Sequence, residues 1–331
     1  MALDFPTSPV DGQGYQGFEW DATAGVWRIV KQFVDPVDIP QAIQFICVAG
    51  GGSGGGYVGG GGGAGGFLSS VVGEESYSAF DTASYGEAGK AETIPFSGSF
   101  TVTVGAGAGR AATLGSSSQV GSFFAYGGGR GGSGGGDGTY TATTGGSGGG
   151  GGTANATRAP GAATPLGQGF YGGYSPIPGG LYQSAGGGGA GQRGGQPTSN
   201  NDTQNSYGGQ GRVSTITGSS VYYAGGGGGS CAALASGGVP GLGGDGGGGD
   251  AAAFGETGAQ AGATNTGGGG GGGSVDFTAP GAAGGSGIVV IRYPVTLPTL
   301  TSIGAGLTYS YGVGDNYRIY TFTAGTGTVT V

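Results

Sequence analysis

Hydrophobic residues are concentrated near the two ends of a long glycine-rich region, and their spacing predicts β-strands there. Residues 43–49 form an apolar run that leads directly into Gly50, and residues 286–293 contain a second run rich in β-branched side chains. Residues 100–104 alternate apolar and polar side chains, which is typical of a strand with one buried face. A short apolar stretch at 67–72 indicates a further strand. The pattern predicts a β-layer that holds the glycine-rich region at both of its ends.

The first 40 residues predict a small separate module. Residues 18–20 and 26–30 are strand-like and are joined by residues 21–25, so they predict a β-hairpin with a five-residue loop. Prolines bracket this unit, and both tryptophans of the chain lie in it. Such a hairpin is too small to be very stable alone. We expect an attachment module whose core consists of Phe18, Trp20 and Trp27.

Glycine accounts for 94 of the 331 residues, and much of it stands in uninterrupted blocks. Glycine loses more backbone freedom on folding than any other residue, so such blocks indicate either disorder or backbones that approach where no Cβ fits. Disordered tracts are typically charged and poor in aromatic residues, whereas this chain has 8% charged residues and 17 Tyr. Collagen needs glycine at every third position, which the seven consecutive glycines of 267–273 exclude. We therefore expect ordered packing.

Polyglycine II geometry suits these blocks. It has three residues per turn and no internal hydrogen bonds, so each N–H and C=O points sideways and needs a partner. The sequence predicts a mainly β fold with polyglycine II helices, in which antiparallel strands clamp a glycine-rich sandwich, and essentially no α-helix. The expected divisions are 1–40 as the hairpin attachment module, 41–293 as the glycine-rich body and 294–331 as a C-terminal β-strand module.

Charge and residue usage argue against several functions. The net charge is −8 with only ten Lys and Arg, and no basic cluster is present to follow a nucleic-acid backbone. The chain has no histidine, which removes the usual catalytic base and the commonest metal ligand. Cys47 and Cys231 are expected to be small buried thiols, although a disulfide between them remains open. We expect no enzyme activity, no cofactor and no metal.

Acidic residues provide the remaining enzyme-like feature. Glu74 with Glu75, or Asp245 with Asp250, have the residue types of a glycosidase dyad. Together with Asp137, the last two could also be read as Ca²⁺ ligands, although no ion-binding spacing is present. The simpler interpretation is that these carboxylates are exposed solubilising charges.

The sequence shows no membrane or export signal. No stretch approaches the ~20 apolar residues of a membrane span. The N-terminus has neither the basic nor the apolar region of a secretory signal. We expect synthesis in the cytoplasm and no membrane insertion.

Polar and aromatic inserts at 153–185, 192–224 and 251–266 separate the glycine blocks. Tyr, Ser, Gly and Asn, which are frequent in them, also give antibody paratopes their amphipathic contacts at low entropic cost. The same tyrosines suit a second role, in which they cap glycine rods and shield them from water, and both roles remain open. The candidate receptor contacts are Phe170, Tyr171, Tyr174, Tyr182 and Tyr207.

Five segments resemble, in order, the glycine-rich domain of tailed-phage tail-fibre and virion proteins; they begin at Phe45, Phe100, Tyr222, Asn265 and Gly285. The N-terminal module is similar to one in marine phage structural proteins. Tip adhesins of T-even-like phages show a related plan, a polyglycine II sandwich whose end loops bind the host receptor. The resemblance implies a virion protein whose partners are a host receptor (a glycan or an outer-surface protein), other fibre subunits and further copies of itself.

The C-terminus departs from this family pattern. Residues 317–331 resemble a strand pair that often precedes such a glycine domain, but here they follow it. They either complete the β-layer of their own chain or pair with a neighbouring subunit, and an unpaired terminal strand favours the neighbour. Two functions are expected: binding of the host cell surface or completion of a fibre, and alternatively a purely structural virion or filament subunit that assembles through its terminal β-modules.

Overall fold

Two compact units, Met1–Gln41 and Ala42–Val331, make up the computed structural model of the protein. The structure describes residues 14–15, 18–23, 26–29, 42–74, 92–110, 113–134, 141–153, 159–175, 183–198, 206–231, 239–253, 258–274 and 280–331. These residues contain fifteen β-strands and no helix, which confirms the expectation of a mainly β fold with essentially no α-helix.

The N-terminal unit contains three antiparallel strands, β1 (Gly14–Tyr15), β2 (Phe18–Asp21) and β3 (Val26–Ile29). β2 and β3 form the hairpin that the sequence predicts, with Trp20 directly opposite Trp27. Asp21 already pairs with Val26, so the loop is one residue shorter than predicted. The side chains of Phe18, Trp20 and Trp27 lie outside the described part of this unit, and their role as its core stays a prediction.

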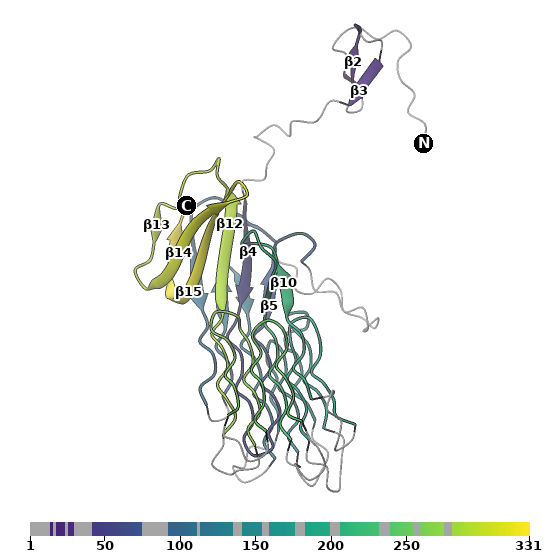
Figure 1. Ribbon diagram of the computed structural model, residues 1–331. Helices are drawn as coiled ribbons and strands as arrows, with labels where there is room; N and C mark the ends of the chain where they lie inside the picture. The colour runs from purple at the N-terminus through teal and green to yellow at the C-terminus, as the bar shows by residue number, and fades with distance from the viewer. Residues whose placement is uncertain are drawn as a thin grey trace. The chain divides into compact units, whose positions relative to one another are not determined.

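One ten-stranded antiparallel sheet organises the larger unit (Figure 1). Its main path runs β5-β4-β12-β15-β7-β8-β9, with β6 on β4 and with β13 and β14 on β15, while β10 and β11 form a separate hairpin. The strands are β4 (Ala42–Val48), β5 (Phe67–Ser69), β6 (Ile94–Pro95), β7 (Ser99–Val104), β8 (Ser118–Val120), β9 (Phe123–Ala125), β10 (Arg212–Ser214), β11 (Val221–Tyr223), β12 (Ile288–Pro294), β13 (Ser302–Ile303), β14 (Leu307–Gly314) and β15 (Tyr317–Thr330).

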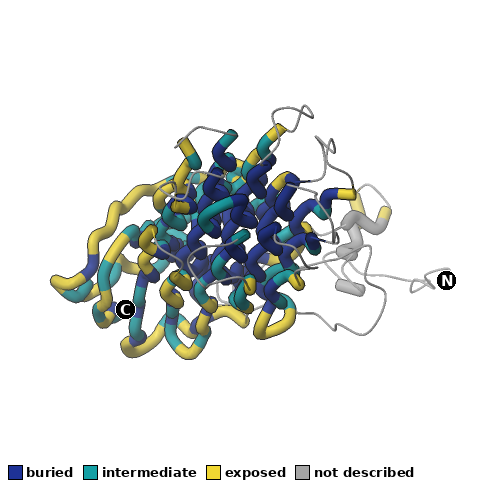
Figure 2. The backbone as a smooth tube through the Cα atoms, turned by 90° about the horizontal axis from the view of Figure 1, so that it is seen from below, coloured by how far each residue is buried: buried dark blue, intermediate teal, exposed yellow. Residues whose placement is uncertain are grey.

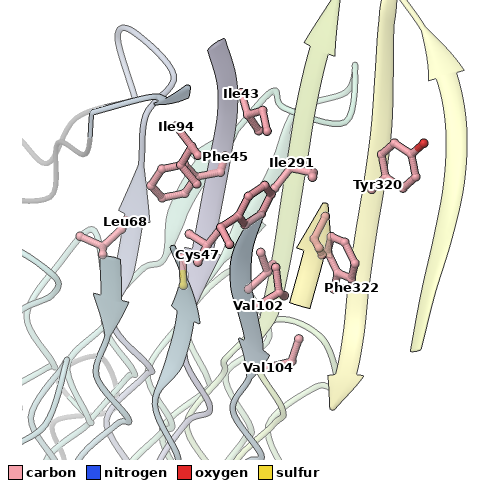
Figure 3. Close-up of a cluster of buried hydrophobic side chains, with 14 of the residues drawn as sticks. Ile43, Phe45, Cys47, Leu68, Ile94, Val102, Val104, Ile291, Tyr320 and Phe322 are labelled. Carbon is pink, nitrogen blue, oxygen red and sulfur yellow. The ribbon is translucent and has the colours of Figure 1, made fainter. Parts of the chain in front are cut away.

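β4 and β12, from opposite ends of the glycine-rich region, pair directly as the hydrophobic pattern predicts. The strand expected over 67–72 ends at Ser69, because the chain turns immediately afterwards. Side chains of β4 on one face, including Phe45 and Cys47, join Val102 and Phe322 in the main core (Figure 3). Those on the other face join a second buried cluster. Burial of both faces explains why this strand reads as a continuous apolar run.

A buried residue, Gln168, helps to link the two ends of the sheet path. Its main-chain oxygen accepts a hydrogen bond from the Phe67 N–H of β5 at 2.9 Å. Its side chain accepts from the Tyr126 N–H at 2.9 Å and donates to the Phe124 oxygen of β9 at 2.8 Å. Because β5 and β9 are the outermost strands of the path, the sheet is nearly closed.

The C-terminal strand β15 lies inside the sheet. Residues 317–322 pair with β12 and 325–330 pair with β7, while β14 and β13 also pair along β15. Gly325, the first residue of the second half, has a φ of +93°, a conformation that favours glycine. The expected pairing of this strand with a neighbouring subunit is therefore wrong: β15 bonds to strands of its own chain along both halves.

Glycine-rich segments extend from the strands and lie side by side (Figure 1). Segment 58–66 shows the bonding pattern. The N–H groups of Gly61, Gly62 and Gly63 donate to three different segments, at the carbonyls of Ala185, Gly270 and Gly129, over 3.0, 2.8 and 2.7 Å. Their own carbonyls accept from three others, at Gly150, Gly227 and Gly52, over 2.8, 2.9 and 2.8 Å. We call this array the glycine lattice; its inner segments are buried when seen from below (Figure 2).

Packing in the glycine lattice leaves no room for most side chains. A Cβ on Gly61 would lie 1.9 Å from the carbonyl oxygen of Gly227, and one on Gly269 would lie 2.0 Å from that of Gly62. These neighbours are backbone atoms, which cannot rotate away as a side chain can. The lattice still admits alanine at selected positions such as Ala64, which is fully buried. Close backbone contact therefore explains the glycine blocks.

Candidate recognition surface

The backbones of aromatic residues from two different inserts bond to one short stretch of the glycine lattice. The Gly194 N–H donates to the Tyr171 oxygen at 3.1 Å, and the next N–H, of Gly195, donates to the Tyr207 oxygen at 2.8 Å. Tyr171 and Tyr207 therefore lie on segments that are both bonded to the same short stretch. Tyr171 is half-buried and Tyr207 is 36% exposed.

The other candidate contacts have different surroundings. Phe170 is half-buried, and its backbone bonds to Gly189 and Gly148 at 3.0 and 2.9 Å, so it belongs to a lattice segment. Tyr174 is half-buried further along that segment. Tyr182 lies outside the described residues. The insert 153–185 thus contains lattice backbone, which its mixed composition did not indicate.

Two apolar residues that sequence reasoning missed extend the surface. The Gly208 N–H, next to Tyr207, donates to the Leu242 oxygen at 2.8 Å. Leu242 is 66% exposed, and Val239 is 46% exposed three residues earlier. The sequence did contain a signal for these residues. A large side chain that stands alone in a glycine block has to point outward, because the interior of the lattice has no room for it. We call Tyr171, Tyr207, Val239 and Leu242 the aromatic–apolar face.

A second exposed group lies where Gln168 joins the sheet edges. Phe124 and Tyr126 are 46% and 47% exposed, and their backbones bond to the Gln168 side chain. Leu166, two residues before Gln168, is 50% exposed. No sequence motif singled out these residues, since their proximity depends on the closure of the sheet.

Glu74 is not the exposed solubilising charge that the sequence suggested. Its carboxylate accepts hydrogen bonds from the hydroxyls of Ser69 and Ser214 at 3.0 and 2.6 Å. It also accepts from the N–H and hydroxyl of Thr215 at 2.6 and 3.0 Å. Nearby, burial lowers the pKa of Arg212 to about 10, and this guanidinium donates to the Glu74 main-chain oxygen at 3.1 Å. We call this arrangement the Glu74 clasp, because it ties the turn after β5 to the β10–β11 hairpin.

The remaining candidate ligands and thiols are dispersed. Asp250 accepts a hydrogen bond from the Gly243 N–H at 2.8 Å, while Glu75 and Asp137 lie outside the described residues. Within the described segments, no three His, Cys, Asp or Glu side chains gather as metal ligands. Cys47 and Cys231 are buried and not joined by a disulfide. Burial raises the pKa of Cys47 to about 12, which keeps its thiol protonated.

These features define a class of protein: an all-β scaffold in which a nearly closed sheet supports a glycine lattice with aromatic side chains on its outside. The chain belongs to the glycine-rich domain family, whose model matches residues 31–294. No curated protein and no solved structure matches the chain. Among the described residues, no helix is long and apolar enough to cross a membrane.

Proposed function

We propose that this protein is a non-enzymatic tail-fibre or tip protein of a tailed phage that binds the host cell surface or completes a fibre. The proposal is carried by one observation: the segments of Tyr171 and Tyr207, from separate inserts, bond to adjacent residues of one lattice stretch, and the exposed Leu242 lies on a segment bonded to the residue after Tyr207. Tyrosine offers amphipathic contact with two rotatable side-chain bonds, and a hydrogen-bonded backbone has little freedom left to lose on binding. The receptor is a glycan or an outer-surface protein.

We further infer that the lattice segments are polyglycine II helices. Successive N–H groups of Gly61, Gly62 and Gly63 directed at three different neighbours support a helix with three residues per turn. In such a helix Tyr171 and Tyr174 project from the same side, which enlarges the aromatic–apolar face. A crystal structure tests this: φ and ψ near about −75° and +145° through 59–66 support it, and β-strand angles contradict it.

The binding experiment uses the full chain, fluorescently labelled, on a panel of intact bacterial cells. Tyr207→Ala is expected to weaken cell binding on the order of tenfold, the effect of losing an aromatic interface anchor. Tyr222→Ala is the matched control, because Tyr222 is 47% exposed on β11 and is not one of the residues of the aromatic–apolar face. Equal loss in both variants, or no binding by the parent protein to any cell, overturns the receptor role.

The proposed location is the virion, after synthesis in the host cytoplasm, with other fibre subunits and further copies of this chain as partners. Antibody labelling of intact particles in the electron microscope distinguishes a tail tip from a fibre shaft or a capsid. The alternative, a structural subunit without a receptor, is supported by strand β14, which pairs with β15 alone among the described strands. It predicts labelled particles together with no cell binding by the isolated protein.

A further inference from the structure

β14 is an open edge of the main sheet. It pairs with β15 and with no other strand among the described residues (Figure 1). All residues from Thr308 to Val313 are exposed, so both faces of the strand reach the surface. An unpaired strand of this kind presents a row of free N–H and C=O groups to another strand.

The usual protections of an edge strand are missing here. Leu307–Gly314 contains no charged residue and no proline, whereas natural edges are commonly blunted by one or the other. The outer strands β5 and β9 are instead joined through Gln168. β14 is therefore an eight-residue edge with nothing built into its sequence to repel a partner.

The side chains of β14 are already ordered for contact. The Tyr309 ring lies 5.9 Å from that of Phe322, and the Tyr311 ring lies 4.7 Å from that of Tyr320. The Tyr311 hydroxyl also accepts a hydrogen bond from Arg318 at 2.7 Å. Tyr309 and Tyr311 nevertheless stay 46% and 45% exposed. Binding here would bury aromatic surface at a small further cost in side-chain entropy.

We propose that the occupant of this edge is the β14 strand of a second copy of this chain, paired antiparallel around Ser310. Each chain carries a net charge of −8, so two copies meet with the least repulsion at a surface without charged residues, which β14 provides. Centring the pair on Ser310 sets Tyr309 of each copy opposite Tyr311 of the other. A two-fold interface repeats every contact, and cross-strand aromatic pairs are favourable.

This inference rests on the homo-oligomer of the proposed function and supplies its contact surface. It also moves the expected intersubunit strand from 317–331, which is interior, to Leu307–Gly314. Deleting 307–331 would remove β15 from the sheet, so a point substitution on the edge is the appropriate test.

The test is sedimentation velocity of the full chain over a range of concentrations at about 0.15 M ionic strength, where repulsion between the acidic chains is screened. The parent protein is expected to form a dimer, and Ser310→Lys is expected to weaken it on the order of tenfold, because two like charges then face each other across the two-fold axis. Ser219→Lys is the matched control, since Ser219 is an exposed serine in the β10–β11 turn. Near-UV circular dichroism confirms that each variant keeps its tertiary packing.

A charge-swap experiment tests the register. Ser310→Lys and Ser310→Glu should each dimerise poorly alone, and an equimolar mixture should recover dimer through opposite charges at the axis. A monomeric parent protein, or a Ser310→Lys variant that dimerises like the parent, overturns the inference. If an oligomer persists in Ser310→Lys, the chains assemble through a surface other than β14. The inference about β14 is then wrong, while the homo-oligomer of the proposed function is retained. Neither result changes the cell-binding test of Tyr207, so the two proposals fail separately.

Discussion

The absence of a side chain is the property that matters most at the scale of single residues. At Gly61 and Gly269 a Cβ would overlap a backbone carbonyl of another segment, and the same N–H and C=O groups are bonded to further segments. Elsewhere the space is open: a Cβ on Gly109 would meet nothing within 4 Å. The glycines of this chain therefore fall into two groups: those that close packing requires and those at positions where a side chain would fit.

Replacing Gly269 with alanine should separate these two groups. Gly269→Ala places a methyl group 2.0 Å from a carbonyl oxygen, and we expect a loss of stability of about 3 kcal/mol, the upper end for overpacking, or a failure to fold. Gly109→Ala is the control and should leave stability nearly unchanged. Urea unfolding followed by tyrosine fluorescence measures both. If the two variants unfold at the same urea concentration, the close packing of the lattice is wrong.

At the scale of elements, a few polar residues add connections beyond the ladder hydrogen bonds of the sheet. Gln168 joins β5 to β9, and the Glu74 clasp joins the turn after β5 to the β10–β11 hairpin. Each connection satisfies backbone or hydroxyl groups that would otherwise lack partners. These contacts explain how short strands of three residues stay in place.

Glu74→Gln tests the clasp. An amide offers one acceptor oxygen where the carboxylate offers two, and it turns an NH₂ group toward hydroxyl and N–H donors. We expect a loss of about 1.5–3 kcal/mol, the range for hydrogen bonds to a charged group, with faster hydrogen exchange in residues 212–223. Glu92→Gln, at an exposed glutamate, is the control. Unchanged exchange in the hairpin would contradict the clasp.

At the scale of the whole molecule, stability should fall in alkali. The thiol of Cys47 has a pKa of about 12 in the folded protein and about 9 when unperturbed, so between these values the unfolded chain binds fewer protons. Stability therefore decreases as pH rises, by at most about 1.4 kcal/mol per pH unit from this group. Burial raises the pKa of Tyr223 and Tyr293 as well, which adds a decrease of the same sign above pH 10.

The check is urea unfolding of the parent and of Cys47→Ala at pH 9 and pH 10, below the main tyrosine titration. The parent should lose more stability over this interval than the variant. Their difference isolates the thiol, since both proteins keep every tyrosine. Equal losses would show that Cys47 titrates alike in the folded and unfolded chain.

How far the sequence predicted the fold differs between elements. The apolar runs of β4 and β12 and the alternation of β7 marked real strands, because burial of one or both faces leaves a local pattern. No sequence pattern indicated which strands pair with β15. We expected a strand of a neighbouring subunit, but β15 pairs with β12 and β7 of its own chain. Among the candidate contacts, single tyrosines were identifiable, but the neighbourhood of Tyr171, Tyr207 and Leu242 was not.

By itself, the sequence determined that this protein is all-β, that glycine blocks are its main structural feature, and that strands from both ends of the glycine-rich region form one layer. These properties follow from local side-chain patterns and from the missing Cβ. Tertiary structure alone decided which segments are neighbours, that β15 is interior and β14 open, and that Glu74 is a clasp. Hydrogen bonds between glycine backbones carry no side-chain signature, so only the folded arrangement specifies their partners.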